Sequence, residues 1–195
     1  MFDIINKFEN KIAKFFGSKF AVSTDCCTHA IEMCLIYNKI QNISIPNRTY
    51  LSVPMTAKKL NIRWQWQDNP WEHYYKLSDN IYDAAVLWKQ NSYIPNTFMC
   101  LSFQFKKHLS LGRGGMILTD NESAYHDLIK LSYDGRSRDL PWAEQDIDSF
   151  GYHYYMTPET AQLGLDKLDT AINTIPKTWS WQDYPDLRNM SIFVQ

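Results

Sequence analysis

Apolar residues recur along the chain at helical spacing in five segments. The first places Ile5, Phe8 and Ile12 on one face, and Gly17 follows as a stop signal. The last begins at Thr157-Pro158, an N-cap followed by proline at the first helical position. The helices predicted in this way cover residues 5–16, about 28–38, 50–60, 122–132 and 158–172.

Short apolar runs between these helices predict buried strands. They are KFAVS, ISIP, the run after Asn61, IYDAAVLW, TFMCLSF and GMILTD. Strands that alternate with helices are typical of an α/β fold in which helices flank a mainly parallel sheet. We expect such a domain over residues 1–175. Residues 176–195 show no clear period and are interpreted as an extended C-terminal arm.

Composition and charge exclude several classes of protein. Hydrophobic residues make up 45% and charged residues 21% of the 195 positions, which is the balance of a folded domain. The net charge of -1, without a block of Lys or Arg, lacks the electrostatic footprint of a nucleic-acid binder. The chain shows no apolar run near ~20 residues, no signal-peptide pattern and no paired C-x-x-C spacing. We therefore expect a cytoplasmic protein with reduced cysteines that binds neither membrane nor nucleic acid.

Two predicted strand ends carry candidate chemistry, and open α/β sheets bind ligands at the carboxyl ends of their strands. At the turn 25–28, backbone N–H groups and the Thr28 hydroxyl could hold a phosphate, although a capping threonine explains the same residues. Asp83 lies inside an apolar strand, where a carboxylate needs a charged or hydrogen-bonding partner. A pyridinium nitrogen and a structural arginine are equally good partners for it.

A third candidate is Lys107, in a loop between two strands that ends in Gly112, Gly114 and Gly115. Adjacent lysines such as Lys106 and Lys107 usually form a solvated surface hairpin. The glycines, however, permit close approach of the backbone to a bulky group. No arrangement of histidines, cysteines and carboxylates in the sequence indicates a metal site.

The segment SFQFKKHLSLGRGGMILTDNESAYHDLIKLSYDG resembles the region around the pyridoxal-phosphate (PLP) lysine of the DegT–DnrJ–StrS sugar-nucleotide aminotransferases. In that family the lysine stands four positions after a Ser-Phe pair, which places it on Lys107. Three further segments match in the same order: FENKIAKFFGSKFAVSTDCCTHAIEMCL, ISIPNRTYLSVPMTAKKLNI and GYHYYMTPETAQLGLDKL. The resemblance covers most of residues 7–170 and implies a reduced large domain of the aspartate-aminotransferase (type I PLP) fold.

The resemblance also implies a role for each matched residue. Lys107 would form the Schiff base with PLP and then shuttle a proton, while Asp83 would keep the pyridine nitrogen protonated. Thr28 and Ser102 would bind the cofactor phosphate, and Tyr50 would pack on the ring.

The sequence departs from the family at several matched positions. Cys26-Cys27 replaces a Ser-Gly pair, so that Cys27 stands at the phosphate turn, and Val86 replaces a glutamine. His153 replaces the asparagine that, in the family, reaches the cofactor phosphate of a neighbouring subunit. The stretch between about residues 63 and 83 is shorter than in the family, and the resemblance implies a compacted form without the C-terminal small domain.

The implied function is an aminotransferase, similar to a perosamine synthase, that transfers an amino group from an amino acid to the keto group of a nucleotide-linked sugar. A homodimer is expected, because the cofactor site of such enzymes lies between subunits. The alternatives are another PLP reaction on a small amino acid, or a non-catalytic homologue that serves binding or assembly. An aromatic cluster at the shortened stretch is expected to cover the core or a subunit interface rather than to form a substrate pocket. Its members are Trp64, Trp66, Trp71, Tyr74 and Tyr75.

Overall fold

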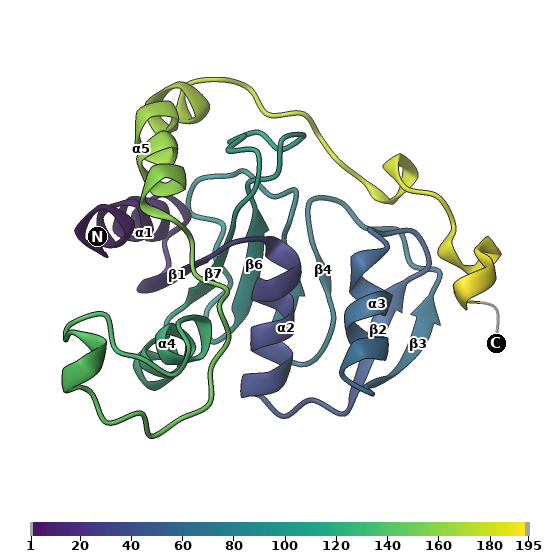
Figure 1. Ribbon diagram of the computed structural model, residues 1–195. Coiled ribbons are helices and arrows are strands. Elements are labelled where there is room, and N and C mark those ends of the chain that lie inside the picture. The colour runs from purple at the N-terminus through teal and green to yellow at the C-terminus, as the bar shows by residue number, and fades with distance from the viewer. Residues whose placement is uncertain (1, 194–195) are drawn as a thin grey trace.

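A computed structural model of the chain describes residues 2–193 and shows an α/β layer structure (Figure 1). The helices are α1 (Phe2–Phe16), α2 (Cys27–Tyr37), α3 (Ser52–Lys59), α4 (Glu122–Ser132) and α5 (Pro158–Ile172). The strands are β1 (Phe20–Thr24), β2 (Asn42–Pro46), β3 (Arg63–Gln67), β4 (Tyr75–Lys76), β5 (Ile81–Asp83), β6 (Phe98–Ser102) and β7 (Gly115–Thr119). All five helices expected from the apolar spacing are confirmed.

The strands form a mixed arrangement, which corrects the expectation of a mainly parallel sheet. Five strands lie in the order β1-β7-β6-β5-β4, and only β5 and β6 run parallel in it. The link from β4 to β5 spans only residues 77–80, and such a short link can join only antiparallel neighbours, whereas the 14 residues between β5 and β6 are long enough for a parallel crossover. β2 and β3 form a separate parallel pair beside β4. The Ser44 N–H of β2 donates to the carbonyl of Leu77, the residue that follows β4 (3.0 Å).

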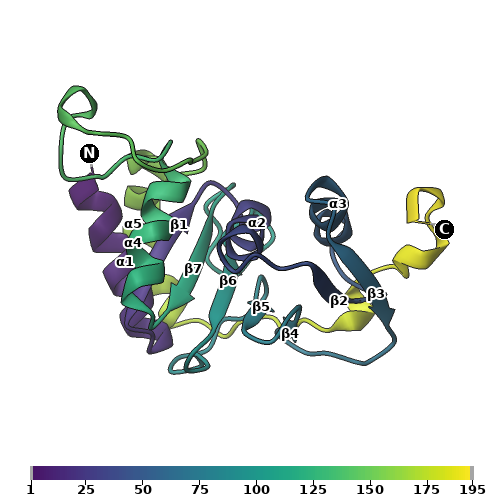
Figure 2. The ribbon, with the colours of Figure 1, turned by 90° about the horizontal axis from the view of Figure 1, so that it is seen from below.

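Figure 2 shows the sheet and its helices from below. Two apolar cores fill the spaces between them. On one face, α1 and α5 pack together, with Ile5, Phe8 and Leu168 fully or almost fully buried. Gly164 makes this contact possible, because a Cβ at this position would lie 2.6 Å from the Phe8 ring. On the other face, α2 and α4 bury Ile31 and apolar neighbours against the sheet. Among residues 2–193, no helix combines the length and apolar character needed to cross a membrane.

The strand expected over 81–88 contains only three residues, Ile81–Asp83. Its end is fixed by two local hydrogen bonds. The Ala85 N–H donates to Asp83 Oδ1 (2.9 Å), and the Leu87 N–H donates to the Ala84 carbonyl (3.0 Å). The chain therefore turns directly after Asp83, which places this carboxylate at the carboxyl end of β5.

The C-terminal segment crosses from α5 to β2 and is broken by three 3₁₀ turns, so it is not simply extended (Figure 1). The Leu187 N–H donates to the Asn47 carbonyl (2.8 Å), and Arg48 donates to the Tyr184 carbonyl (2.9 Å). The buried Phe193 packs on Trp66, with ring centroids 5.9 Å apart. Trp66 thus covers the core and anchors this segment, as expected for the aromatic cluster, but Trp71 and Tyr75 of the same cluster line a cavity, which corrects that expectation for these two residues.

Candidate active site

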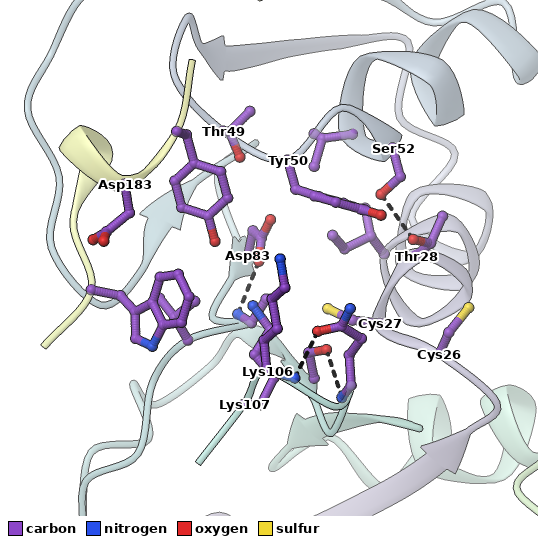
Figure 3. Close-up of a pocket in the computed structure, with 18 of the residues that line it drawn as sticks. Cys26, Cys27, Thr28, Thr49, Tyr50, Ser52, Asp83, Lys106, Lys107 and Asp183 are labelled. Atoms are coloured by element: carbon purple, nitrogen blue, oxygen red, sulfur yellow. Dashed lines mark hydrogen bonds between the residues drawn. The ribbon is translucent and has the colours of Figure 1, made fainter. Parts of the chain in front are cut away.

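A cavity of about 560 Å³ opens where β1, β5 and β6 end and where α2 and α3 begin (Figure 3). Its volume lies in the range of small-molecule sites, and its position at strand ends is typical of ligand sites in α/β proteins. The cavity brings together six of the seven expected site residues. They are Lys107, Asp83, Thr28, Cys27, Tyr50 and Ser102.

The first turn of α2 leaves backbone N–H groups open toward the cavity, since the initial N–H groups of a helix have no intrahelical partner. The N-cap residue Cys26 makes no side-chain capping bond to them within the described chain. Thr28 Oγ1 donates to Ser52 Oγ (2.8 Å), so hydroxyls of α2 and α3 meet at the cavity wall (Figure 3). Helix N-termini of this kind bind anions.

Gly115 lets β7 pass directly beneath this turn. A Cβ on Gly115 would lie 2.4 Å from the Cys26 carbonyl carbon and 2.5 Å from the Cys27 nitrogen. Gly115, the last of the three glycines that end the Lys107 loop, therefore serves close backbone packing. The turn thus forms with Cys27 at the position where the family has glycine.

Charged side chains flank the same turn. Asp25 accepts hydrogen bonds from Arg113 (2.7 Å) and from His29 Nδ1 (2.6 Å), and the His29 ring stacks on Tyr154 at 3.6 Å. Burial is the largest single effect and lowers the pKa of His29, but the hydrogen bonds and charges of Asp25 and Cys26 together raise it to about 9. Asp25, Cys26 and His29 are close enough to share a metal ion, yet two cationic groups and a helix N-terminus disfavour a cation here. This edge of the cavity favours an anion.

Ionisation of His29 should make the stability of the fold depend on pH. The pKa of His29 is about 9 in the folded chain and 6.5 ordinarily, so its contribution is complete below pH 6.5 and disappears as pH rises through 9. We expect the free energy of unfolding to fall by about 1 kcal/mol over this window, because solvent screens a partly exposed pair. Urea unfolding between pH 6 and pH 10 measures it. His29→Gln should flatten the profile, and an unchanged profile in that variant would contradict the assignment.

Lys107 lies in the loop between β6 and β7 and points into the cavity. Two backbone hydrogen bonds hold this loop. The Phe103 N–H donates to the Gly114 carbonyl across the loop (2.9 Å), and the Lys107 N–H donates to the Gln104 carbonyl within it (2.7 Å). Burial lowers the pKa of Lys107, while the nearby Asp83 charge offsets part of the effect. A lysine with a lowered pKa is more often neutral, and the neutral amine is the form that attacks carbonyl carbons.

Asp83 is 4% exposed and is held by two donors. Its Oδ1 accepts from the Ala85 N–H, and its Oδ2 accepts from the Tyr75 hydroxyl, which also contacts Thr49 Oγ1 (2.5 Å). Burial raises the pKa of Asp83, whereas the two hydrogen bonds and the Lys107 charge lower it. The partner of the buried carboxylate is thus a tyrosine, and not an arginine. Tyr75 belongs to the aromatic cluster that is expected from the sequence to cover the core rather than to form a pocket, and Thr49 carries no pattern in the sequence that would have identified it.

The C-terminal segment contributes a wall that sequence reasoning missed. Trp179, Asp183 and Tyr184 line the cavity, and the Trp179 ring centroid lies 5.2 Å from Lys107 Nζ. Lys177 covers the same ring at 3.9 Å and donates to Asp183 (2.7 Å). This segment shows no hydrophobic period, so the sequence held no signal for it. Arg113 also lines the cavity. Its place between Gly112 and Gly114 is a sequence feature that could have identified it as a site residue.

His153 does not line the cavity of its own chain. The Tyr152 N–H donates to the Leu131 carbonyl (2.7 Å) and the Tyr154 N–H to the Ser132 carbonyl (3.0 Å), which fixes the intervening residue beside α4. His153 is exposed there, with Nδ1 2.9 Å from Asp134 Oδ2. A role of His153 toward the cofactor of a neighbouring subunit stays a prediction.

The mixed sheet flanked by helices, with a lysine, a buried carboxylate and an open helix N-terminus at its strand ends, defines the class: this is the type I fold of PLP aminotransferases. The sequence profile of the DegT/DnrJ/EryC1/StrS aminotransferase family matches residues 2–70 and 95–178. The chain belongs to this family. Residues 71–94, which include Asp83, lie outside the match.

Similar proteins extend well beyond the length of this chain. An uncharacterized protein of Methanocaldococcus jannaschii is 24% identical over 220 residues, which cover 85% of this chain and 56% of that protein. The structure of AtS13 from Actinomadura melliaura is similar with a TM-score of 0.75 and 16% identity, over 86% of this chain and 60% of that one. A Streptococcus pneumoniae protein assigned as a sugar aminotransferase, solved in its PLP form, has a TM-score of 0.71 and 16% identity, over 86% and 59% of the two chains.

Proposed function

We propose that this chain is a PLP-dependent aminotransferase. The observation that carries the proposal is the cavity in which the half-buried Lys107 and the buried Asp83 face one space beside the open N-terminus of α2. These residues fit the cofactor, which requires an amine, a carboxylate for its ring nitrogen and a cradle for its phosphate.

Each part of the cofactor has a matching group in the cavity. The N–H groups at Cys27 and Thr28, with the Ser102 hydroxyl, would hold the phosphate at the α2 N-terminus. Asp83 would accept from the ring nitrogen, and Tyr50, at the rim, would pack against the ring. When bound, PLP supplies an electron sink for the bonds around the amino-bearing carbon.

Lys107 would anchor the cofactor and then carry a proton at Nζ between carbon and cofactor. Its lowered pKa suits both tasks, because the amine is readily neutral and is readily reprotonated. The Trp179 ring beside Nζ excludes water from this side of the lysine.

For the substrate, we infer an amino acid as donor and a keto sugar linked to a nucleotide as acceptor. Family membership and the solved sugar aminotransferase support this inference. Lys106 and Arg113, both on the cavity wall, offer positive charge to an anionic acceptor. A PLP reaction on a small amino acid is the second candidate, because the bulky side chains of Trp179 and Tyr184 line the cavity and leave less room for a large acceptor.

We further infer a homodimer in the cytoplasm. The loop 135–152 carries Trp142 and Phe150 with 69% and 79% of their surface exposed, and exposed apolar side chains of this size are typical of interfaces. The four cysteines form no disulfide in the described chain, in agreement with a reducing compartment.

The amino-donor half-reaction tests the function directly. Protein loaded with PLP should lose its visible cofactor band when glutamate is added, and a 2-oxo acid should restore the band. We expect the amino form of the cofactor to accumulate with at least one proteinogenic amino acid. A protein that takes up PLP but leaves it unchanged with every donor would contradict transamination.

A further inference from the structure

Tyr75 lies directly opposite Asp83 in the antiparallel pair of β4 and β5. Opposite residues of such a pair project their side chains to the same face of the sheet. The four residues between the strands form a tight turn, in which the Leu77 N–H donates to the Ile81 carbonyl (2.8 Å). The pairing is thus a product of this local hairpin, residues 75–83. The hairpin lies in the stretch 71–94, which is outside the family match.

A chain of hydrogen bonds leads through the tyrosine to the carboxylate. The Tyr75 hydroxyl donates to Asp83 Oδ2, so Thr49 Oγ1 must donate to the tyrosine oxygen (2.5 Å). All three side chains are buried, with 2% of Thr49, 8% of Tyr75 and 4% of Asp83 exposed. Burial and the neighbouring Asp83 charge raise the pKa of Tyr75 well above its ordinary value, which keeps the proton on the phenol. The tyrosine therefore stays protonated, donates to Asp83 and accepts from Thr49.

The two donors also decide where Asp83 points. Ala85 binds Oδ1 and Tyr75 binds Oδ2, so the carboxylate cannot rotate without breaking one of these bonds. Each carboxylate oxygen accepts more than one hydrogen bond. Asp83 therefore retains acceptor capacity toward the cavity that it lines.

We propose that Tyr75, supported by Thr49, is a positioning residue that orients Asp83 and keeps it ionised for the ring nitrogen of the cofactor. The inference rests on the proposed function and deepens it. Without the phenol, the buried carboxylate would lose one of its two donors and would more readily take up a proton or rotate. Its hydrogen bond to a pyridinium N–H would then weaken, while the phosphate cradle at α2 would be unaffected.

The test compares the dissociation constant of PLP with that of 1-deaza-PLP, in which carbon replaces the ring nitrogen. Tyr75→Phe should weaken PLP binding about 10-fold, the effect of one hydrogen bond to a charged group. It should leave binding of the deaza compound unchanged, because that ring makes no hydrogen bond to Asp83. Tyr74→Phe is the matched control, since this neighbouring tyrosine is 37% exposed and lies outside the chain of hydrogen bonds.

Equal weakening of both compounds, or no weakening of PLP, would overturn the positioning role. Thr49→Val, which removes the donor to Tyr75, should give a smaller loss with the same selectivity, and it provides the test should Tyr75→Phe not fold. Failure of the proposed function looks different: the parent protein would then bind neither compound.

Discussion

Lys107→Ala will reduce the rate of the amino-donor half-reaction by about 10³-fold or more, while Lys106→Ala will leave it nearly unchanged. A positioned acid–base group contributes about 10²–10⁴-fold, and Lys107 would also anchor the cofactor. The two adjacent lysines differ in burial. Lys107 is half-buried near Asp83, with a pKa lowered by burial, whereas Lys106 is exposed. Single-turnover kinetics on PLP-loaded protein measure both variants.

Lys106→Ala is a demanding control, because it removes the same charge from the same loop. Equal losses in the two variants would mean that the loop supplies only positive charge. Full activity of Lys107→Ala would remove this residue from the mechanism.

Asp83→Asn will slow the same half-reaction by about 10²-fold or more without destabilising the fold. Asparagine keeps the shape and can still accept from the Ala85 N–H, and its amide nitrogen can donate to the Tyr75 oxygen if the Tyr75 hydroxyl turns to donate to Thr49. It carries no charge, however, to hold the ring nitrogen protonated. Burial raises the pKa of Asp83, so the ionised carboxylate costs the fold free energy that asparagine does not. We therefore expect the urea midpoint of the variant to be equal to or above that of the parent.

Asp79→Asn, at a fully exposed position four residues away, is the matched control and should change neither quantity. A variant Asp83→Asn that lost activity and stability together would indicate a structural carboxylate. A variant with full activity would show that the ring nitrogen needs no charged partner here.

Several residues of this site could be predicted because they stand in recognisable local sequence patterns. The family resemblance locates Lys107 by its distance from the Ser-Phe pair and from Gly112, whereas the apolar run around Asp83 by itself marks a buried carboxylate that needs a partner. Gly115 makes the phosphate turn possible, and its contact with Cys26 and Cys27 follows from the β1–β7 pairing.

The remaining features depend on register and on long-range packing. Tyr75 contacts Asp83 because β4 and β5 pair as a hairpin. A strand of two residues is too short to show a periodicity from which this pairing could be predicted. Trp179 reaches Lys107 only because the C-terminal segment is fastened to Asn47 and Arg48, which stand far earlier in the chain. The positions of apolar residues also could not indicate whether two strands run parallel or antiparallel, because side chains alternate between the two faces in both kinds of strand.

The central claim is that Lys107 binds PLP covalently in this cavity, and borohydride trapping tests it most directly. Protein incubated with PLP, reduced with borohydride and digested should yield one modified peptide. We predict a single phosphopyridoxyl group on Lys107, which disappears in Lys107→Ala and persists in Lys106→Ala. A protein that gains no visible absorbance and no stable adduct, or one that is modified equally on many surface lysines, would contradict the claim.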